Sequence, residues 1–228
     1  FMLEMNEKRE RDIREKFNNK QINYISTNFI FYEPKHKFNA IICNPPFNFG
    51  GNIKTPTNNK QEKKEDGFNS WCDFVNKSLE ILEDDGYMCF IVPALWLKPD
   101  KAGMYHKLLK YKLHYIKSLS ASETNTIFNK QAQTPTTIFL LQKTLVKENI
   151  LSLFCSQERK YIPFTLKTNK PIPMTNIKLL NKMNNLVDLY GHIDVVKTNM
   201  PPKSYQFSLK QNETYPYKCI RTVTLIKN

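Results

Sequence analysis

Short apolar runs alternate with polar or amphipathic stretches over the first 145 residues. This alternation is typical of strand–helix–strand units built around a largely parallel sheet, with helices flanking the strands. The pattern therefore predicts an α/β fold for residues 1–145. It places strands at residues 1–4, 22–25, 38–43, 87–92, 113–119 and 137–141, and helices at 7–17, 68–82 and 101–112.

The helix predicted at residues 68–82 carries an apolar stripe. Its apolar side chains recur at helical spacing on one face, and Gly86 follows where a helix commonly ends. We interpret the stripe as core packing, without a cofactor role. It consists of Phe68, Trp71, Cys72, Val75, Leu79 and Leu82.

The run Phe38–Cys43 (FNAIIC) is almost entirely apolar and is followed by Asn44, Pro45 and Pro46. An apolar run of this length predicts a buried strand, and it ends where proline removes the backbone donors. Open α/β sheets bind ligands at the carboxyl ends of their strands. We therefore expect a functional site at Asn44.

Two regions depart from the alternating pattern. Residues 48–67 are mostly Asn, Lys, Gly and Thr, which predicts a mobile surface loop. Beyond about residue 146, Pro, Asn and Lys dominate and the apolar runs are short and weak. A smaller C-terminal module is therefore expected at residues 146–228, with strand and turn at 186–196.

The charge balance favours a polyanionic partner. Lys and Arg number 34 against 21 Asp and Glu, which gives a net charge of +13 spread along the chain. Each phosphate contact releases a counterion and adds affinity. The same composition is explained equally well by a genome bias toward Lys and Asn, in which case these residues only solvate the protein surface.

Metal, disulfide and membrane signatures are missing from the sequence. The five cysteines have no CxxC spacing, and the four histidines show no HExxH or similar pairing. No apolar run approaches the roughly 18–20 residues that a membrane span needs, and no signal peptide opens the chain. We expect a soluble, intracellular protein without a bound metal.

The residues Asn44, Pro45, Pro46 and Phe47 suit the methylation of an exocyclic amine. The lone pair of adenine N6 is delocalised into the ring, so hydrogen bonds from its two protons must favour a tetrahedral nitrogen. The Asn44 side-chain oxygen and the Pro45 carbonyl can accept those protons, while the prolines fix their direction. Phe47 offers a ring on which an extruded base can stack. The same four residues also fit an ordinary proline turn.

With its surroundings, this motif resembles the γ-type N6-adenine DNA methyltransferases of restriction-modification systems, from Phe1 to about Lys143. The resemblance implies a Rossmann-like methyltransferase sheet in residues 1–145, S-adenosylmethionine as cofactor and double-stranded DNA as partner. It also implies that residues 146–228 form part of a target-recognition region. The segments that carry it are FMLEMN (1–6), TNFI (27–30), FNAIICNPPF (38–47), FIVPALWL (90–97) and IFNK (127–130).

The family's binding residues map onto this sequence one by one. Glu4 matches the acidic residue that holds the ribose hydroxyls of the cofactor, and Asn44 also faces the cofactor in that family. Asn28 and Phe29 stand where the family has an Asp-Phe pair that binds the cofactor's adenine. A neutral Asn28 should contribute less than the roughly 1.5–3 kcal/mol of a charge-assisted bond. Phe128 matches the aromatic on the other face of the target base, although a core role fits it equally well.

One family feature is absent, the glycine-rich turn after the first strand. Gly50 and Gly51 follow the catalytic strand and lack the strand–Gly–helix context of such a site. The chain opens on the apolar Phe1 without a turn or cap, so we expect an additional N-terminal segment that carries this turn. A degenerate member that cannot bind cofactor by itself is the alternative.

Other functions remain open at this point. Asn-Pro-Pro with an aromatic also occurs in methyltransferases that act on RNA bases or on glutamine side chains. The extended loop after the catalytic strand and the C-terminal module favour DNA. A non-catalytic nucleic-acid-binding remnant of the fold would also explain the missing glycine turn and Asn28. The resemblance leaves room for an associated nuclease.

Overall fold

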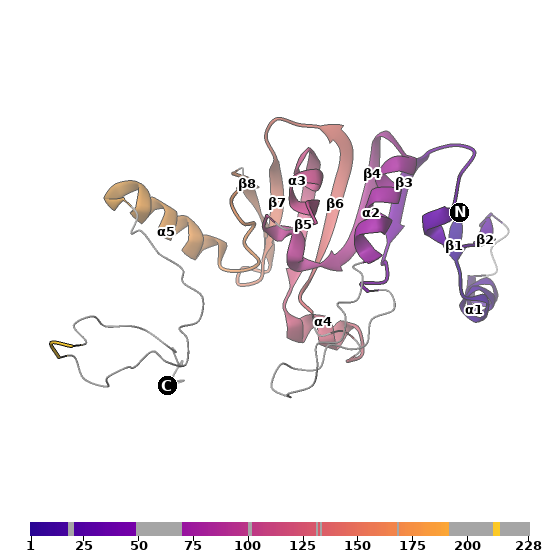
Figure 1. The fold of residues 1–228 in the computed structure, drawn as a ribbon, viewed down its shortest axis with the longest axis horizontal. Helices are drawn as coiled ribbons and strands as arrows, with labels where there is room; N and C mark the ends of the chain where they lie inside the picture. The colour runs from indigo at the N-terminus through magenta and orange to yellow at the C-terminus, as the bar shows by residue number, and fades with distance from the viewer. Residues whose placement is uncertain are drawn as a thin grey trace. The chain divides into compact units, whose positions relative to one another are not determined.

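The computed structural model describes residues 1–17, 21–48, 70–99, 102–130, 132, 134–167, 169–191 and 212–214. The chain divides into two compact units, Phe1–Met183 and Asn184–Asn228. The described part of the first unit contains a two-stranded sheet and a six-stranded sheet (Figure 1). All predicted site residues belong to this first unit.

The two-stranded sheet pairs β1 (Met2–Glu4) with β2 (Tyr24–Ser26) in parallel, and α1 (Glu7–Phe17) connects them. A short 3₁₀ helix, η1 (Phe29–Phe31), follows β2. These elements confirm the strands and the helix predicted for this region. Because Glu4 is opposite Ser26 in a parallel pair, Glu4 and the residues after β2 lie at the same edge of the sheet.

The six-stranded sheet has the order β3-β4-β6-β5-β7-β8. Strands β3, β4, β5 and β7 run in one direction, whereas β6 and β8 run in the other. The predicted α/β fold is confirmed, with an antiparallel strand inserted between β4 and β5. The strands are β3 (Phe38–Cys43), β4 (Leu82–Pro93), β5 (Tyr111–Leu119), β6 (Thr136–Leu145), β7 (Ile150–Cys155) and β8 (Lys160–Thr165).

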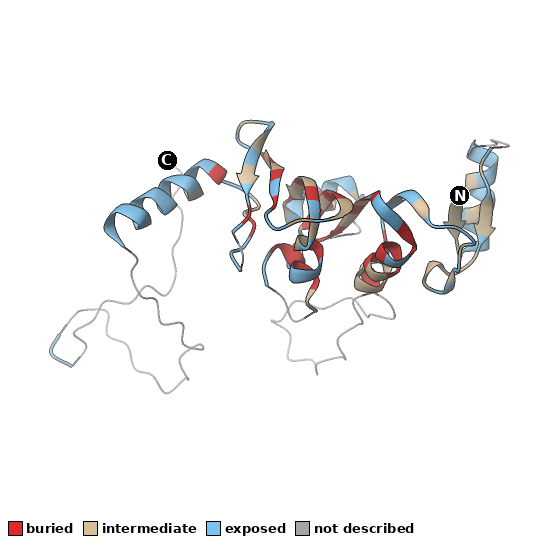
Figure 2. Cartoon of the chain, turned by 90° about the horizontal axis from the view of Figure 1, so that it is seen from above, coloured by how far each residue is buried: buried red, intermediate tan, exposed pale blue. Residues whose placement is uncertain are grey.

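The hydrophobic core lies between one face of this sheet and the helices α2 (Ser70–Ile81) and α3 (Met104–Leu109), with η2 (Ala94–Leu97) at the end of β4. Figure 2 shows buried residues concentrated on these helices and on the strands beside them. Trp71, Val75 and Leu79 of α2 pack against strand residues such as Phe90. The core role predicted for the apolar stripe is confirmed for its described members; Phe68 lies outside the described residues.

Strand β3 has the predicted bounds, but the prediction that it is buried was wrong. Ile41 and Cys43 pack against the core, whereas Ile42 is 86% exposed on the opposite face. Within the described residues, β3 pairs only with β4. An apolar run predicts a strand, but it does not reveal whether other elements cover both of its faces.

The prediction that Gly86 caps a helix was also wrong. Helix α2 ends at Ile81, and Gly86 lies inside β4, which begins at Leu82. A Cβ at Gly86 would lie 2.9 Å from the Glu83 carbonyl oxygen and 3.0 Å from that of Asn39. Glycine is therefore required here by the close approach of β3, since a side chain would collide with backbone.

The C-terminal part of the first unit differs from the sequence-based outline. Strands β7 and β8 extend the main sheet beyond residue 145, and the compact units divide after Met183. Helix α5 (Ile177–Tyr190) includes residues 186–190, where strand and turn were predicted, so that prediction was wrong there; residues 192–196 of the same prediction lie outside the described residues. Most of the predicted surface loop, residues 49–67, lies outside the described residues.

Candidate active site

The turn Asn44–Phe47 follows β3 at the edge where β3, β4, β5 and β7 all end. Pro45 is buried, whereas Asn44 is exposed. The Ser70 hydroxyl, at the first residue of α2, donates a hydrogen bond to the Pro46 carbonyl at 2.7 Å. Ser70 therefore anchors the turn to the start of α2. Sequence reasoning missed this residue, although a serine before an apolar helical stripe is a recognisable signal.

Two acceptors of this turn are available for a ligand. In the described part of the chain, neither the Asn44 side chain nor the Pro45 carbonyl takes part in a hydrogen bond. Burial raises the pKa of the neighbouring Cys43 thiol to about 12, so this thiol stays protonated and is no nucleophile at neutral pH. The turn consequently offers hydrogen-bond acceptors and no strong base.

Phe47 and Phe128 are brought together although they are distant in sequence. Their ring centroids are 6.3 Å apart in an edge-to-face arrangement with an interplanar angle of 71°. Phe128 caps the carboxyl end of α4 (Ala121–Ile127). The Thr124 hydroxyl, buried in α4, lies 3.0 Å from that of Thr136 at the start of β6. The main sheet thus supports both rings.

The predicted cofactor-side residues are occupied by local contacts. The Glu4 carboxylate accepts from the Asn6 backbone N–H at 2.9 Å, and the Asn28 side chain accepts from the Ile30 N–H at 3.1 Å. The Phe29 ring stacks on Phe74 of α2 with centroids 5.2 Å apart. Each acceptor keeps lone pairs for a further bond. Within the described residues, no hydrogen bond or ring contact links these side chains to Asn44.

Helix α2 connects the two halves of the candidate site. It holds Phe29 through Phe74 and the turn Asn44–Phe47 through Ser70. Lys77, buried in α2, forms ion pairs with Glu33 at 2.5 Å and with Glu80 at 3.2 Å. The hydrogen bond to Glu33 raises the pKa of Lys77, which therefore remains charged. One helix thus sets the position of both halves.

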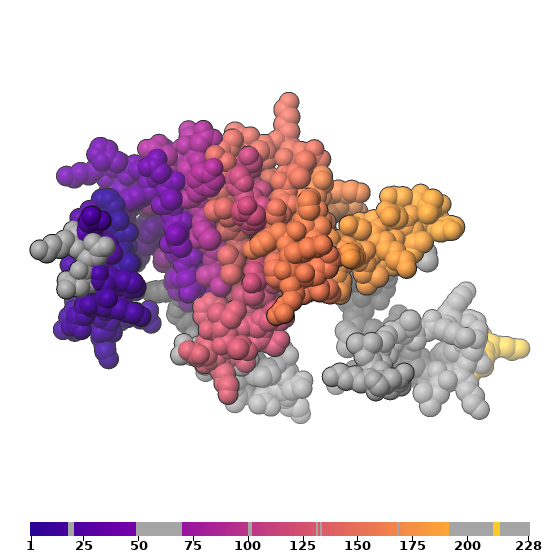
Figure 3. All heavy atoms as spheres, turned by 180° about the vertical axis from the view of Figure 1, so that it is seen from behind, coloured from indigo at the N-terminus to yellow at the C-terminus, as the bar shows by residue number. Residues whose placement is uncertain are grey.

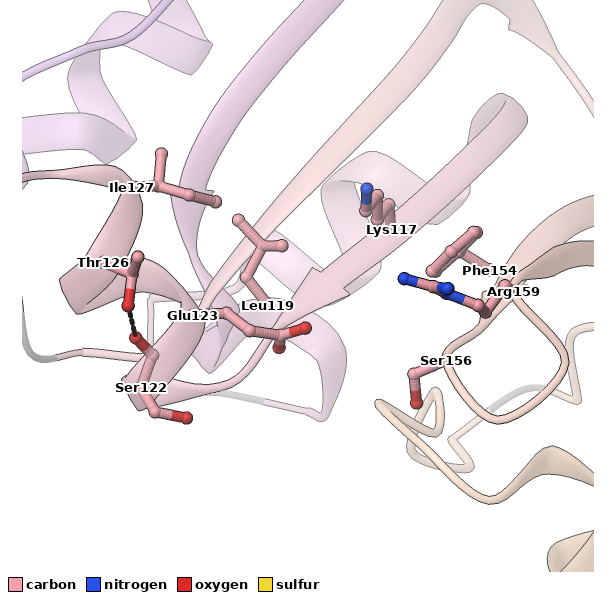
Figure 4. Close-up of a pocket in the computed structure, with 9 residues that line it drawn as sticks. All are labelled: Lys117, Leu119, Ser122, Glu123, Thr126, Ile127, Phe154, Ser156 and Arg159. Carbon is pink, nitrogen blue, oxygen red and sulfur yellow. Dashed lines mark hydrogen bonds between the residues drawn. The ribbon is translucent and has the colours of Figure 1, made fainter.

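An open cavity of about 460 Å³ lies beside α4, between that helix and the turn that joins β7 to β8 (Figure 4). Seen from behind, the α4 and β7–β8 segments both reach the molecular surface here (Figure 3). None of the predicted site residues lines this cavity. Ile127, the residue before Phe128, does line it.

Neither a metal site nor a membrane span emerges from the described residues. They contain no group of three or more His, Cys, Asp or Glu side chains placed to hold a metal ion. None of their helices combines the length and apolar character that crossing a membrane requires.

The main sheet, with its functional turn at the carboxyl end of a strand, has the architecture of Rossmann-like α/β enzymes. Residues 2–128 match the Eco57I restriction-modification methylase family, and the chain belongs to that family. This membership agrees with the restriction-modification methyltransferase class predicted from the sequence.

Individual relatives are more distant. The chain is 28% identical over 96 residues to the type II methyltransferase M.TthHB8I of Thermus thermophilus. This alignment covers 37% of this chain and 22% of the relative. The type I methyltransferase subunit of Streptococcus thermophilus aligns with a TM-score of 0.49 and 17% identity, over 85% of this chain and 43% of that one. The M protein of the type I restriction enzyme EcoKI aligns with a TM-score of 0.48 and 18% identity, over 76% of this chain and 38% of that one. The chain spans less than half the length of each of these proteins.

Proposed function

We propose that this protein is a site-specific DNA methyltransferase that transfers a methyl group from S-adenosylmethionine to N6 of an adenine extruded from duplex DNA. The observation that carries the proposal is the Asn44 side chain, exposed at the carboxyl end of β3 and free of hydrogen bonds within the described residues. The net charge of +13 fits a DNA partner. Residues 146–228 would contribute to recognition of the target sequence.

The chemistry follows from two acceptors at a fixed turn. The Asn44 side-chain oxygen and the Pro45 carbonyl each accept one N6 proton, which localises the nitrogen lone pair for attack on the methyl group. These bonds strengthen as positive charge develops on N6, so they act mainly in the transition state. Ser70, through its bond to the Pro46 carbonyl, fixes the direction of both acceptors.

Base capture would use the aromatic pair. The edge-to-face contact of Phe47 with Phe128 leaves no slot for a base between the two rings. An extruded adenine therefore displaces this contact and stacks on Phe47, with Phe128 against its other face. Such stacking contributes about 1–3 kcal/mol per base, which offsets part of the unstacking cost.

The cofactor side fits S-adenosylmethionine in part. The second oxygen of Glu4 suits a ribose hydroxyl, and the remaining lone pair of the Asn28 oxygen suits the adenine amino group. When bound, the cofactor supplies an electrophilic methyl group. Phe29 already stacks on Phe74, so only its outer face is available to an adenine ring. No glycine-rich turn follows a strand within the described residues.

The test is Asn44→Ala in the protein expressed from the complete reading frame. Transfer of a labelled methyl group to duplex DNA should fall by about 10²–10³-fold, the usual loss of one transition-state hydrogen bond. Asn39→Ala is the matched control, because Asn39 is also exposed on β3 but lies at its other end. Mass spectrometry of the product reports whether N6-methyladenine forms.

Three outcomes would contradict the proposal. Near wild-type turnover of Asn44→Ala would remove Asn44 from the reaction. Methylation of RNA or of a glutamine side chain in preference to duplex DNA would assign a different substrate. A wild-type protein that binds DNA but transfers no methyl group would be the non-catalytic remnant.

A further inference from the structure

The cavity beside α4 is lined by chemically mixed side chains. Lys117 and Arg159 bring positive charge, Ser122 and Ser156 bring hydroxyls, and Phe154 contributes an aromatic surface. Figure 4 shows the side chains of Lys117 and Arg159 extending into the same space from β5 and from the β7–β8 turn. The ammonium group of Lys117 lies 4.7 Å from the centroid of the Phe154 ring. Two cations thus approach one opening from separate elements.

The charges of Lys117 and Arg159 are only partly neutralised by neighbouring carboxylates. Glu158 is engaged by Lys160 at 2.8 Å and by Lys178 at 2.7 Å, so it does not pair with the adjacent Arg159. Within the described residues, the Arg159 guanidinium forms no ion pair. The remaining carboxylate, Glu123, serves the capping box of α4. It accepts from the Ser120 backbone N–H and hydroxyl, each at 2.7 Å.

Helix α4 borders both the cavity and the aromatic pair of the candidate active site. Ile127 lines the cavity, and the next residue, Phe128, contacts Phe47. A strand whose base is held at Phe47 and Phe128 would therefore lie at the carboxyl end of α4, the helix that also borders the cavity.

We propose that this cavity binds a backbone phosphate of the target DNA strand, near the extruded adenine, through Lys117 and Arg159. The sugar of that nucleotide packs on the apolar surfaces of Ile127 and Phe154. This inference rests on the proposed function. Phosphate contacts of this kind position the strand and carry no sequence information.

The experiment uses the complete protein and a fluorescent duplex that contains its recognition site. In the double variant Lys117→Gln/Arg159→Gln, the slope of log binding constant against log salt should decrease in magnitude by about 1, because one neutralised phosphate is lost. Lys112→Gln/Lys147→Gln is the control. It removes the same charge from exposed lysines near the opposite end of β5, and its slope should remain near wild type.

The readout separates this inference from the proposed function. Equal slopes for the two double variants would overturn the phosphate site, whether or not the protein methylates DNA. Turnover at saturating DNA should stay within about twofold of wild type, because the two cations position the strand and act on no reacting atom. A loss of turnover at saturating DNA with an unchanged salt slope would also contradict the inference.

Discussion

The two halves of the candidate site are supported by different parts of the fold. The target-base half, Asn44–Phe47 with Phe128, borders the six-stranded sheet, whose core includes fully buried residues such as Phe90 and Trp96. The cofactor half rests on β1, β2 and η1, and none of these elements contains a buried residue. The chain therefore holds the proposed base-binding residues on a well-packed scaffold, while the proposed cofactor residues depend on a few contacts.

This difference predicts unequal local stability. Elements with few buried apolar contacts open more readily than core strands, so amide hydrogens of β1 and β2 should exchange faster than those of β4 and β6. Contacts with α2 and β3 then matter most, because Phe74 and Lys77 of α2 and Phe38 of β3 join the cofactor half to the main sheet. Changes in the scaffold should affect the target-base half, and changes at α2 should affect the coupling between the halves.

The largest effect on stability is expected from Gly86→Ala, which would push β3 away from β4. A Cβ at this position would collide with two backbone carbonyls, and overpacking of this kind costs about 1–3 kcal/mol. Chemical denaturation measures the loss. Gly103→Ala is the comparison, because no atom lies within 4 Å of its added Cβ, so its cost comes from the backbone strain at a φ of +72° alone and no strand is displaced. Of the two variants, only Gly86→Ala should also impair methyl transfer. If both variants lost stability and methyl transfer to the same extent, the close contact at Gly86 would be contradicted.

A smaller effect is expected from the ring stack that joins the two halves. In a double-mutant cycle of Phe29→Leu and Phe74→Leu, the coupling energy should be about 0.5–1.5 kcal/mol, as for other stacked aromatic pairs. The cycle of Phe29→Leu with Phe154→Leu is the control, since Phe154 lies on β7 and contacts Tyr161 instead. There the two changes should add within about 0.5 kcal/mol. Additivity in the first cycle would show that Phe74 does not hold Phe29.

The parts of this molecule that could be predicted from sequence are those fixed by local pattern. The bounds of α1 and β3 follow from charge-rich helix formers and from an apolar run ended by proline. The exposure of Ile42 could not be predicted, because it depends on whether another element covers that face of β3. Gly86 was assigned to a helix end because glycine favours both a cap and a close backbone approach, and only the position of β3 distinguishes them.

The candidate site divides in the same way. The position of Asn44 and Pro45 directly after a strand could be predicted from the apolar run that ends at proline, and their role as acceptors stays a prediction. The bond from Ser70 to Pro46 spans 24 positions in the sequence. Lys117 of β5 and Arg159 of the β7–β8 turn likewise share a cavity only in the fold. Neither pairing leaves a local pattern, because it depends on how distant elements pack.

The smallest effect concerns the capping box that holds α4, and with it Phe128. Hydrogen bonds from the Ser120 backbone and hydroxyl, with a contribution from Lys117, lower the pKa of Glu123 below its ordinary value of 4.5. A carboxyl whose pKa is lower in the folded state stabilises the fold above the unfolded pKa, and this contribution disappears as the pH falls through the folded pKa. Glu123→Gln should therefore destabilise the protein by about 0.3–1 kcal/mol near neutral pH, as expected for an exposed carboxylate at a helix N-terminus.

The pH dependence separates this charge effect from a loss of packing. The stability difference between wild type and Glu123→Gln, measured by denaturation, should shrink as the pH falls below about 4, because the wild-type carboxyl then becomes neutral. Ser120→Ala removes the other half of the box, so adding Glu123→Gln to it should cost less than Glu123→Gln alone. A difference that stays constant with pH, or full additivity of the two changes, would mean that the capping box does not hold α4. Its carboxyl-terminal Phe128 would then depend on other contacts, among them the one between Thr124 and Thr136.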